Sequence, residues 1–171
     1  MIGNKFFFKR SQILCFILLC SFLTIYIGCG SGFHVSNITV GRADWVNPPA
    51  GFKATIIFRF NRSVAQSSLN TPGTVQISVT GTHDGRTVSN ITGTFIPNGT
   101  WGTASEIAFV TDKTLSELIN PQAGENIEYS IKLIGTSVGA GGVTDANGEG
   151  LDGDENGTPG GNYTKVIMVV G

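Results

Sequence analysis

Short runs in which apolar residues alternate with polar ones constrain the fold of this chain more than any other feature. Val, Ile, Thr and Phe dominate these runs, and clusters of Gly, Asn, Pro and Asp separate them. Alternation with a period of two places the apolar residues on one face of a strand, and the intervening clusters favour turns. The segments that fit this description are 35–40, 53–60, 75–80, 88–95, 106–111, 127–134 and 163–170.

The alternation is clearest in segment 53–60, where Ala54, Ile56 and Phe58 share one face and Arg59 lies on the other. Short strands of this kind, with no long segment of helical period, predict an all-β protein, an antiparallel Ig-like β-sandwich of about seven strands. Segment 112–119 alone has apolar residues at helical spacing, so we expect one or two helical turns there.

The N-terminus has the layout of an export signal. Lys5, Lys9 and Arg10 precede an uncharged apolar run at 13–27. The run is 15 residues long, whereas a membrane-spanning helix needs about 20. We therefore expect this segment to be cleaved rather than to remain as an anchor.

The end of the apolar run, Tyr26-Ile27-Gly28-Cys29, resembles the lipobox of bacterial prolipoproteins. The resemblance implies that Cys29 becomes the first residue and receives a thioether-linked diacylglycerol and an N-acyl chain such as palmitate, which is enough for stable anchoring to a membrane. Gly30 stands where enteric lipoproteins retained in the inner membrane have aspartate, so the resemblance implies the outer membrane in a host with two membranes. Tyr26 replaces the usual aliphatic residue, and ordinary cleavage near 28–31, which gives a secreted chain, stays an alternative.

The expected organisation is a signal peptide at 1–28, a lipidated cysteine and tether at 29–34, and one extracytoplasmic domain at 35–171. Cys15, Cys20 and Cys29 all precede that domain, so a disulfide framework is excluded there. Removing residues 1–28 takes away three basic groups and no acidic one, which lowers the formal net charge from −1 to −4. We expect no nucleic-acid partner.

The domain resembles the bacterial Ig-like domains of the S-layer-protein type. Three segments carry the resemblance: 56–64, with its polar exit Asn61-Arg62-Ser63, 124–131, which runs from Gly124 to Tyr129 and beyond, and 143–152, with an Asp-rich stretch before the last strand. The resemblance implies a non-catalytic module that serves adhesion, binding or spacing at the cell surface, with a surface protein or polysaccharide as its partner. A fold of this kind does not itself specify an activity.

The loop before the last strand contains two sets of oxygen-bearing side chains at alternate positions, each followed by glycine. This is the spacing by which a calcium loop wraps its ion. The candidate Ca²⁺ ligands are Asp145, Asn147, Glu149, Asp152, Asp154 and Asn156. The alternative interpretation is a solvated acidic turn, because Tyr163 occupies the position of the bidentate glutamate and Asp, Asn and Gly are common turn residues.

Two further features bear on function. Trp101 lies among turn residues and is a candidate platform for a sugar or a protein contact, with packing over the end of the sandwich as the alternative. Gly135-Thr136-Ser137-Val138-Gly139 matches the hydrolase elbow motif, but both histidines, His34 and His83, precede it, so we expect no enzyme. The leading hypothesis is a lipid-tethered envelope module, and the competing one is a calcium-assisted carbohydrate-recognition module.

Overall fold

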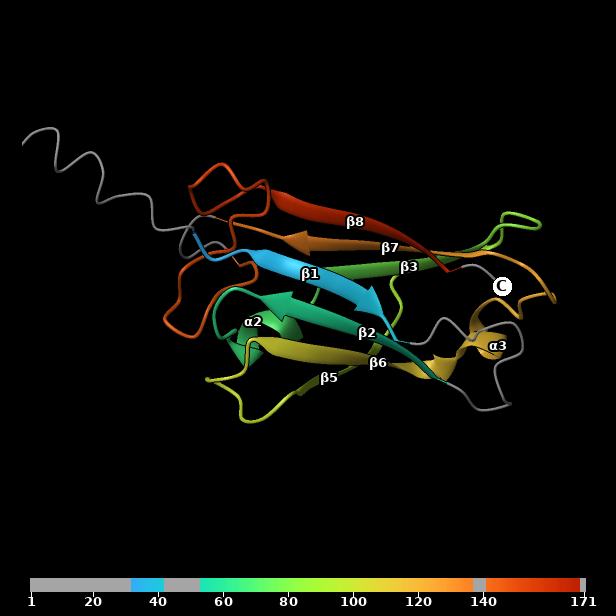
Figure 1. The fold of residues 1–171 in the computed structure, drawn as a ribbon, viewed down its shortest axis with the longest axis horizontal. Helices are drawn as coiled ribbons and strands as arrows, with labels where there is room; N and C mark the ends of the chain where they lie inside the picture. The colour runs from blue at the N-terminus through green and yellow to red at the C-terminus, as the bar shows by residue number, and fades with distance from the viewer. Residues whose placement is uncertain (1–31, 42–52, 137–140, 170–171) are drawn as a thin grey trace, which may run out of the picture. The chain divides into compact units, whose positions relative to one another are not determined.

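The fold is a sandwich of two antiparallel four-stranded sheets (Figure 1). The computed structural model describes residues 32–41, 53–136 and 141–169. The first sheet has the order β1 (Val35–Val40), β2 (Lys53–Phe60), β6 (Glu106–Thr114), β5 (Gly93–Pro97), and the second has the order β4 (Thr87–Val88), β3 (Val75–Gly81), β7 (Ile127–Ile134), β8 (Asn162–Val169). The predicted antiparallel β-sandwich is confirmed.

The order of the strands follows the immunoglobulin-type arrangement. When the strands are lettered in chain order, the first sheet becomes A-B-E-D, and the second becomes C′-C-F-G. Consecutive strands therefore alternate between sheets at β2 to β3, β4 to β5 and β6 to β7. These crossings tie the two sheets together at both ends.

Strong alternation located three strands correctly. Segments 35–40, 53–60 and 127–134 coincide with β1, β2 and β7. Buried and half-buried residues alternate along the whole of β7 and along nearly all of β2. Their inward faces provide much of the core, because a pleated strand turns every second side chain to the same side.

The predicted single strand at 88–95 is wrong. This segment belongs to two strands, because β4 ends at Val88 in one sheet and β5 begins at Gly93 in the other. Asn90 between them has a left-handed backbone, with φ of 54°, which a regular strand cannot contain. Ile91 N–H donates to the carbonyl of Ile77 at 3.0 Å, which fixes the crossing segment beside β3.

The core fills the space between the sheets. Its largest contributions come from the four central strands, through the following residues: Ala54, Ile56, Phe58 and Phe60 of β2, Ile107 and Phe109 of β6, Ile77 and Val79 of β3, and Ile127, Tyr129, Ile131 and Leu133 of β7. Phe95 of edge strand β5 adds to them, with its ring 4.9 Å from that of Phe109 and 6.2 Å from that of Phe58. Burial of these side chains supplies the main free energy of folding.

Two short helices cover the ends of the sandwich. α3 (Leu115–Leu118) lies within the segment that was predicted to be helical, and Thr114 and Glu117 form a capping box at its start. α2 (Gln66–Asn70) was not predicted. Within the described ranges, neither helix nor any other is long and apolar enough to cross a membrane.

Candidate functional site

Residues 32–34 lead into the sandwich at the end where β1 begins and β2 ends. We call this the entry end. Phe33 is fully buried there, and its ring stacks on that of Phe60 with 5.3 Å between the centroids. The Phe33 N–H donates to Glu149 Oε1 at 3.2 Å, and the Phe33 carbonyl accepts from the Asp152 N–H at 2.8 Å. The loops that follow β7 therefore hold the first residue of the described core.

Asn61, at the exit of β2, holds the same segment from the other side. Its Oδ1 accepts from the His34 N–H at 2.9 Å, and its Nδ2 donates to the carbonyl of Gly32 at 2.9 Å. The Asn61 N–H also donates to the carbonyl of His34 at 3.1 Å. We call Asn61, Glu149 and Asp152 the entry clamp, because these three residues together bind the backbone of residues 32–34.

The first half of the predicted calcium set is engaged in hydrogen bonds and ion pairs. Asp145 is buried, and its Oδ1 accepts from the N–H groups of Asn147 at 2.9 Å and Glu149 at 2.8 Å. Arg62 pairs with Glu149 Oε2, and its Nη1 lies 3.8 Å from Asp145 Oδ2. Arg62 therefore supplies the positive charge that the local sequence of the loop lacks.

The second half of the set closes a separate turn. Asp152 is buried, and its two oxygens accept from the N–H groups of Asn156 at 3.0 Å and Gly157 at 2.8 Å. Asp154 accepts from the side chain of Asn156 at 2.9 Å, and Asn156 in turn accepts from the N–H of Thr158 at 2.9 Å. These are the contacts by which Asp and Asn stabilise turns.

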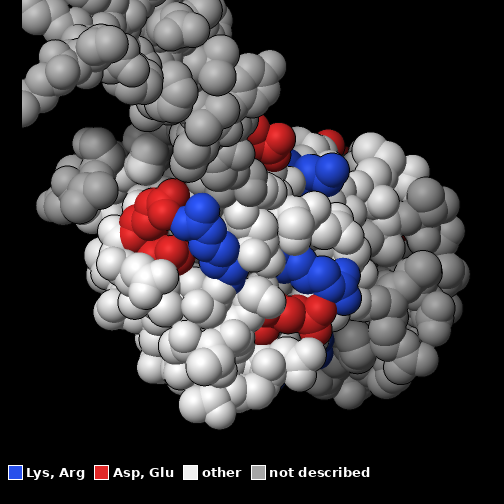
Figure 2. Space-filling view, turned by 60° about the vertical axis from the view of Figure 1, so that its left-hand side comes forward, with Lys and Arg blue, Asp and Glu red and all other residues white. Residues whose placement is uncertain are grey.

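The arrangement of these loops favours a structural role. In the part of the chain that the structure describes, no group of three or more His, Cys, Asp or Glu side chains is placed to hold a metal ion. Figure 2, which brings the entry end forward, shows acidic side chains directly beside basic ones. Calcium binding by Asp145, Asn147, Glu149, Asp152, Asp154 and Asn156 stays a prediction.

The other candidates have simpler placements. Trp101 is half-buried in the turn between β5 and β6 and packs against the core, and its role in ligand binding stays a prediction. Cys29 and Ser137 lie outside the described residues. His34 Nδ1 donates to the carbonyl of Gly32 at 2.9 Å, at the entry end, whereas His83 lies in the loop after β3 at the opposite end.

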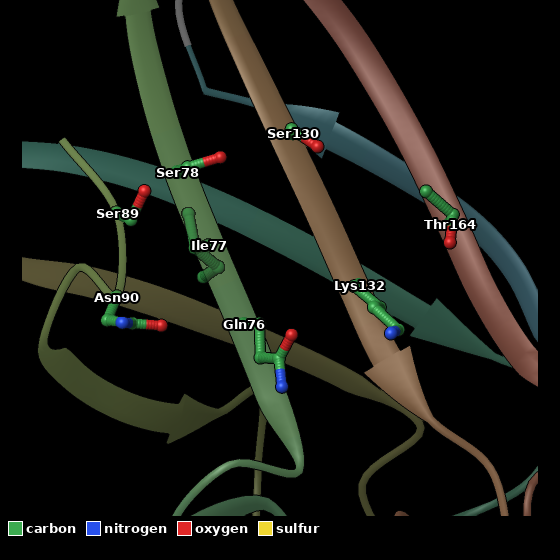
Figure 3. Close-up of a pocket in the computed structure, with 8 residues that line it drawn as sticks. All are labelled: Gln76, Ile77, Ser78, Ser89, Asn90, Ser130, Lys132 and Thr164. Atoms are coloured by element: carbon green, nitrogen blue, oxygen red, sulfur yellow. The ribbon is translucent and has the colours of Figure 1, made fainter. Parts of the chain in front are cut away.

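A polar groove on the outer face of the second sheet is a feature that the sequence pattern did not predict. It encloses about 310 Å³ and crosses β3, β7 and β8, with the segment between β4 and β5 as its wall (Figure 3). The lining residues are Gln76, Ile77, Ser78, Ser89, Asn90, Ser130, Lys132 and Thr164. The alternation of polar residues with Ile77 and Ile131 indicated an outer face, but the groove depends on the pairing of three strands and on the crossing segment.

A second cluster of charges joins two loops at the end opposite the entry end. Glu125 is buried, and its carboxylate accepts from the N–H groups of Gln122 at 2.7 Å and His83 at 2.9 Å. Arg86 Nη2 lies 3.2 Å from Glu125 Oε2, and its guanidinium also donates to the carbonyl of Asn120 at 3.1 Å. The hydrogen bonds from Gln122 and His83, with a smaller contribution from Arg86, lower the pKa of Glu125 below its ordinary value.

Comparisons with known proteins leave the family open. A scan against protein-family models, a search of curated proteins and a search of solved structures each found no match for this chain. The fold and the geometry of these sites are therefore the observations on which a function must be argued.

Asp145→Ala is expected to destabilise the fold by about 2–4 kcal/mol, because two backbone N–H groups lose their acceptor in a buried position. Asp154→Ala, on the exposed part of the same loop, is the matched control and should change the free energy of unfolding by less than about 1 kcal/mol. Urea unfolding of both variants, with and without a calcium chelator, measures the difference. Losses that are equal in the two variants and appear only without chelator would contradict the structural role and favour calcium.

Glu125→Gln is expected to reduce stability at neutral pH and to have progressively less effect in acid. A carboxylate with a lowered pKa in the folded state contributes stability above its ordinary pKa of 4.5 and loses that contribution as the pH falls through the lowered value. The free energy of unfolding of the variant and the natural chain, measured from neutral pH down to pH 3, should therefore converge. A gap that stays constant over this range would show that the charge of Glu125 is not responsible.

Proposed function

We propose that this chain is a non-catalytic, lipid-tethered module of the bacterial cell envelope, of the Ig-like kind found in S-layer-type surface proteins. It acts by binding a partner or by spacing, not by chemistry. The export signal and the lipobox-like Tyr26-Ile27-Gly28-Cys29 supply the route to the surface. The immunoglobulin-type order of the strands is in keeping with the resemblance to that class of module.

The observation that carries the proposal is the short distance along the chain between Cys29 and the folded core. Backbone binding by the entry clamp begins at Gly32, so Gly30 and Ser31 are the residues between the cysteine and the first clamped residue. An extended chain spans about 3.3–3.6 Å per residue. An acylated Cys29 would therefore keep the entry end of the sandwich within about 10 Å of the lipid, which suits a module that is held close to a surface.

The placement of the histidines also supports a non-catalytic role. Nucleophilic hydrolysis needs a base within hydrogen-bond reach of the nucleophile. His34 and His83 lie at opposite ends of the sandwich, so they cannot act together at one site. A function in binding or spacing makes no such demand on side-chain geometry.

Intact-mass spectrometry of the protein extracted from bacterial membranes tests the proposal. We expect a chain that begins at Cys29 and carries the mass of a diacylglyceryl group and an N-acyl chain. Cys29→Ala should abolish that mass, because the sulfur that accepts the lipid is gone. Cys20→Ala, which changes a cysteine within the signal segment, is the matched control and should leave it intact.

An unmodified chain that begins at Gly30 or later would overturn the tethered module and make the protein a secreted domain. Equal loss of the acyl mass in Cys29→Ala and Cys20→Ala would show a general defect of export. That result would contradict the specific role of Cys29 as the acylated residue.

A further inference from the structure

We propose that the polar groove on the outer face of β3, β7 and β8 binds an acidic oligosaccharide, and that this is how the module recognises its partner. This ligand class rests on the proposed binding function and makes it more specific. Recognition then lies on a sheet face, whereas calcium-assisted carbohydrate binding was expected in the Asp145–Asn156 loop.

The floor of the groove is a grid of polar side chains set by the strand register. Lys132 of β7 pairs with Gln76 of β3 on one side and with Thr164 of β8 on the other. Two residues along β7, Ser130 pairs with Ser78. Directly opposed residues of this kind lie about 4.5–5.5 Å apart, so their polar groups can reach neighbouring substituents of one sugar ring.

The wall of the groove is fixed by an unusual backbone. Asn90 has φ of 54°, and the adjacent Ile91 N–H donates to the carbonyl of Ile77. Figure 3 shows the carboxamide of Asn90 pointing towards β3, with Ser89 beside it. Asparagine adopts the left-handed conformation more readily than most residues, and here it turns the chain between β4 and β5 and so sets the position of the wall.

The polar groups of the groove have their hydrogen-bonding capacity available. Within the described residues, no side-chain hydrogen bond or ion pair is formed by Ser78, Asn90, Ser130, Lys132 or Thr164. Gln76 alone makes a long bond, 3.3 Å from its Nε2 to the carbonyl of Gly73. Hydroxyl and amide groups both donate and accept, as the hydroxyls of a sugar do.

The charge of the groove selects an acidic ligand. Lys132 is the one charged residue among the eight that line it, and it forms no ion pair within the described residues. Glu128 lies on the same face of β7 but four residues away, which is about 13 Å along a strand. A ligand carboxylate is therefore the natural partner of the Lys132 ammonium, through a charge-assisted hydrogen bond.

The same features disfavour other ligands. Apolar small molecules need a largely hydrophobic pocket, whereas Ile77 is 2% exposed and the remaining lining is polar. A nucleic acid would need a stripe of basic residues, whereas Lys132 is the one basic residue among the eight that line the groove. Binding through hydroxyls and one ammonium is weak at a single site. Many tethered copies on one surface would raise the apparent affinity for a ligand with several binding units.

Equilibrium dialysis of the detergent-extracted protein against labelled trigalacturonate tests the inference, with galactotriose as the uncharged sugar. We expect trigalacturonate to bind more tightly than galactotriose. Lys132→Gln should weaken trigalacturonate binding by about tenfold or more, because a charge-assisted bond is lost, and Lys132→Arg should keep most of it.

Lys165→Gln is the matched control. Lys165 lies on the neighbouring strand β8 and pairs with the inward-facing Ile131, so it carries the same charge on the other face of the sheet. Lys165→Gln should alter the affinity for trigalacturonate less than twofold. The proposal that the groove binds an acidic oligosaccharide is refuted by any of three results. These are no trigalacturonate binding at millimolar concentration, equal loss of affinity in Lys132→Gln and Lys165→Gln, or binding of galactotriose as tight as that of trigalacturonate. Lipidation of Cys29 is measured separately, so an acylated chain that binds no sugar would remove the groove and leave the tether.

Discussion

The fold depends on the burial of two apolar faces against each other. β2 and β7 each present an unbroken row of buried residues to the centre, and their neighbours β6 and β3 extend these rows. Neither sheet could hide its apolar face from water alone, so the sheets form together or not at all. This frame leaves the outer faces and the two ends free to carry other residues, and both candidate sites lie there.

The entry end shows how acidic residues can serve structure. Asp145 and Asp152 are buried because each satisfies backbone N–H groups, and Glu149 binds both Phe33 and Arg62. The result is a clamp on the residues that directly follow Cys29 and its two-residue tether. The acidic loops thus hold the residues that follow Cys29, the proposed anchor, while the proposed recognition site lies on the outer face of the second sheet.

The sequence predicts those parts of the structure that depend on local pattern. Alternation located β2 and β7 because burial on one face imposes a period of two. The alternation failed at 88–95, because the left-handed Asn90 lies between the end of β4 and the start of β5. The spacing of Asp145, Asn147 and Glu149 is equally typical of a calcium loop and of a turn, and Arg62, which decides the local charge, lies 83 positions before Asp145 in the sequence. The groove needs the register of three strands, which a sequence pattern does not give.

Amide hydrogen exchange in the protein extracted from membranes tests most directly whether the sandwich holds the chain that follows Cys29. We expect the N–H groups of Phe33, His34 and Asp152 to exchange as slowly as those in the middle of β2, because each is bonded within the entry clamp. Rapid exchange at these three positions, beside slow exchange in β2, would mean that the chain after Cys29 is not held by the sandwich. The claim that the fold is fixed directly to its anchor would then be wrong.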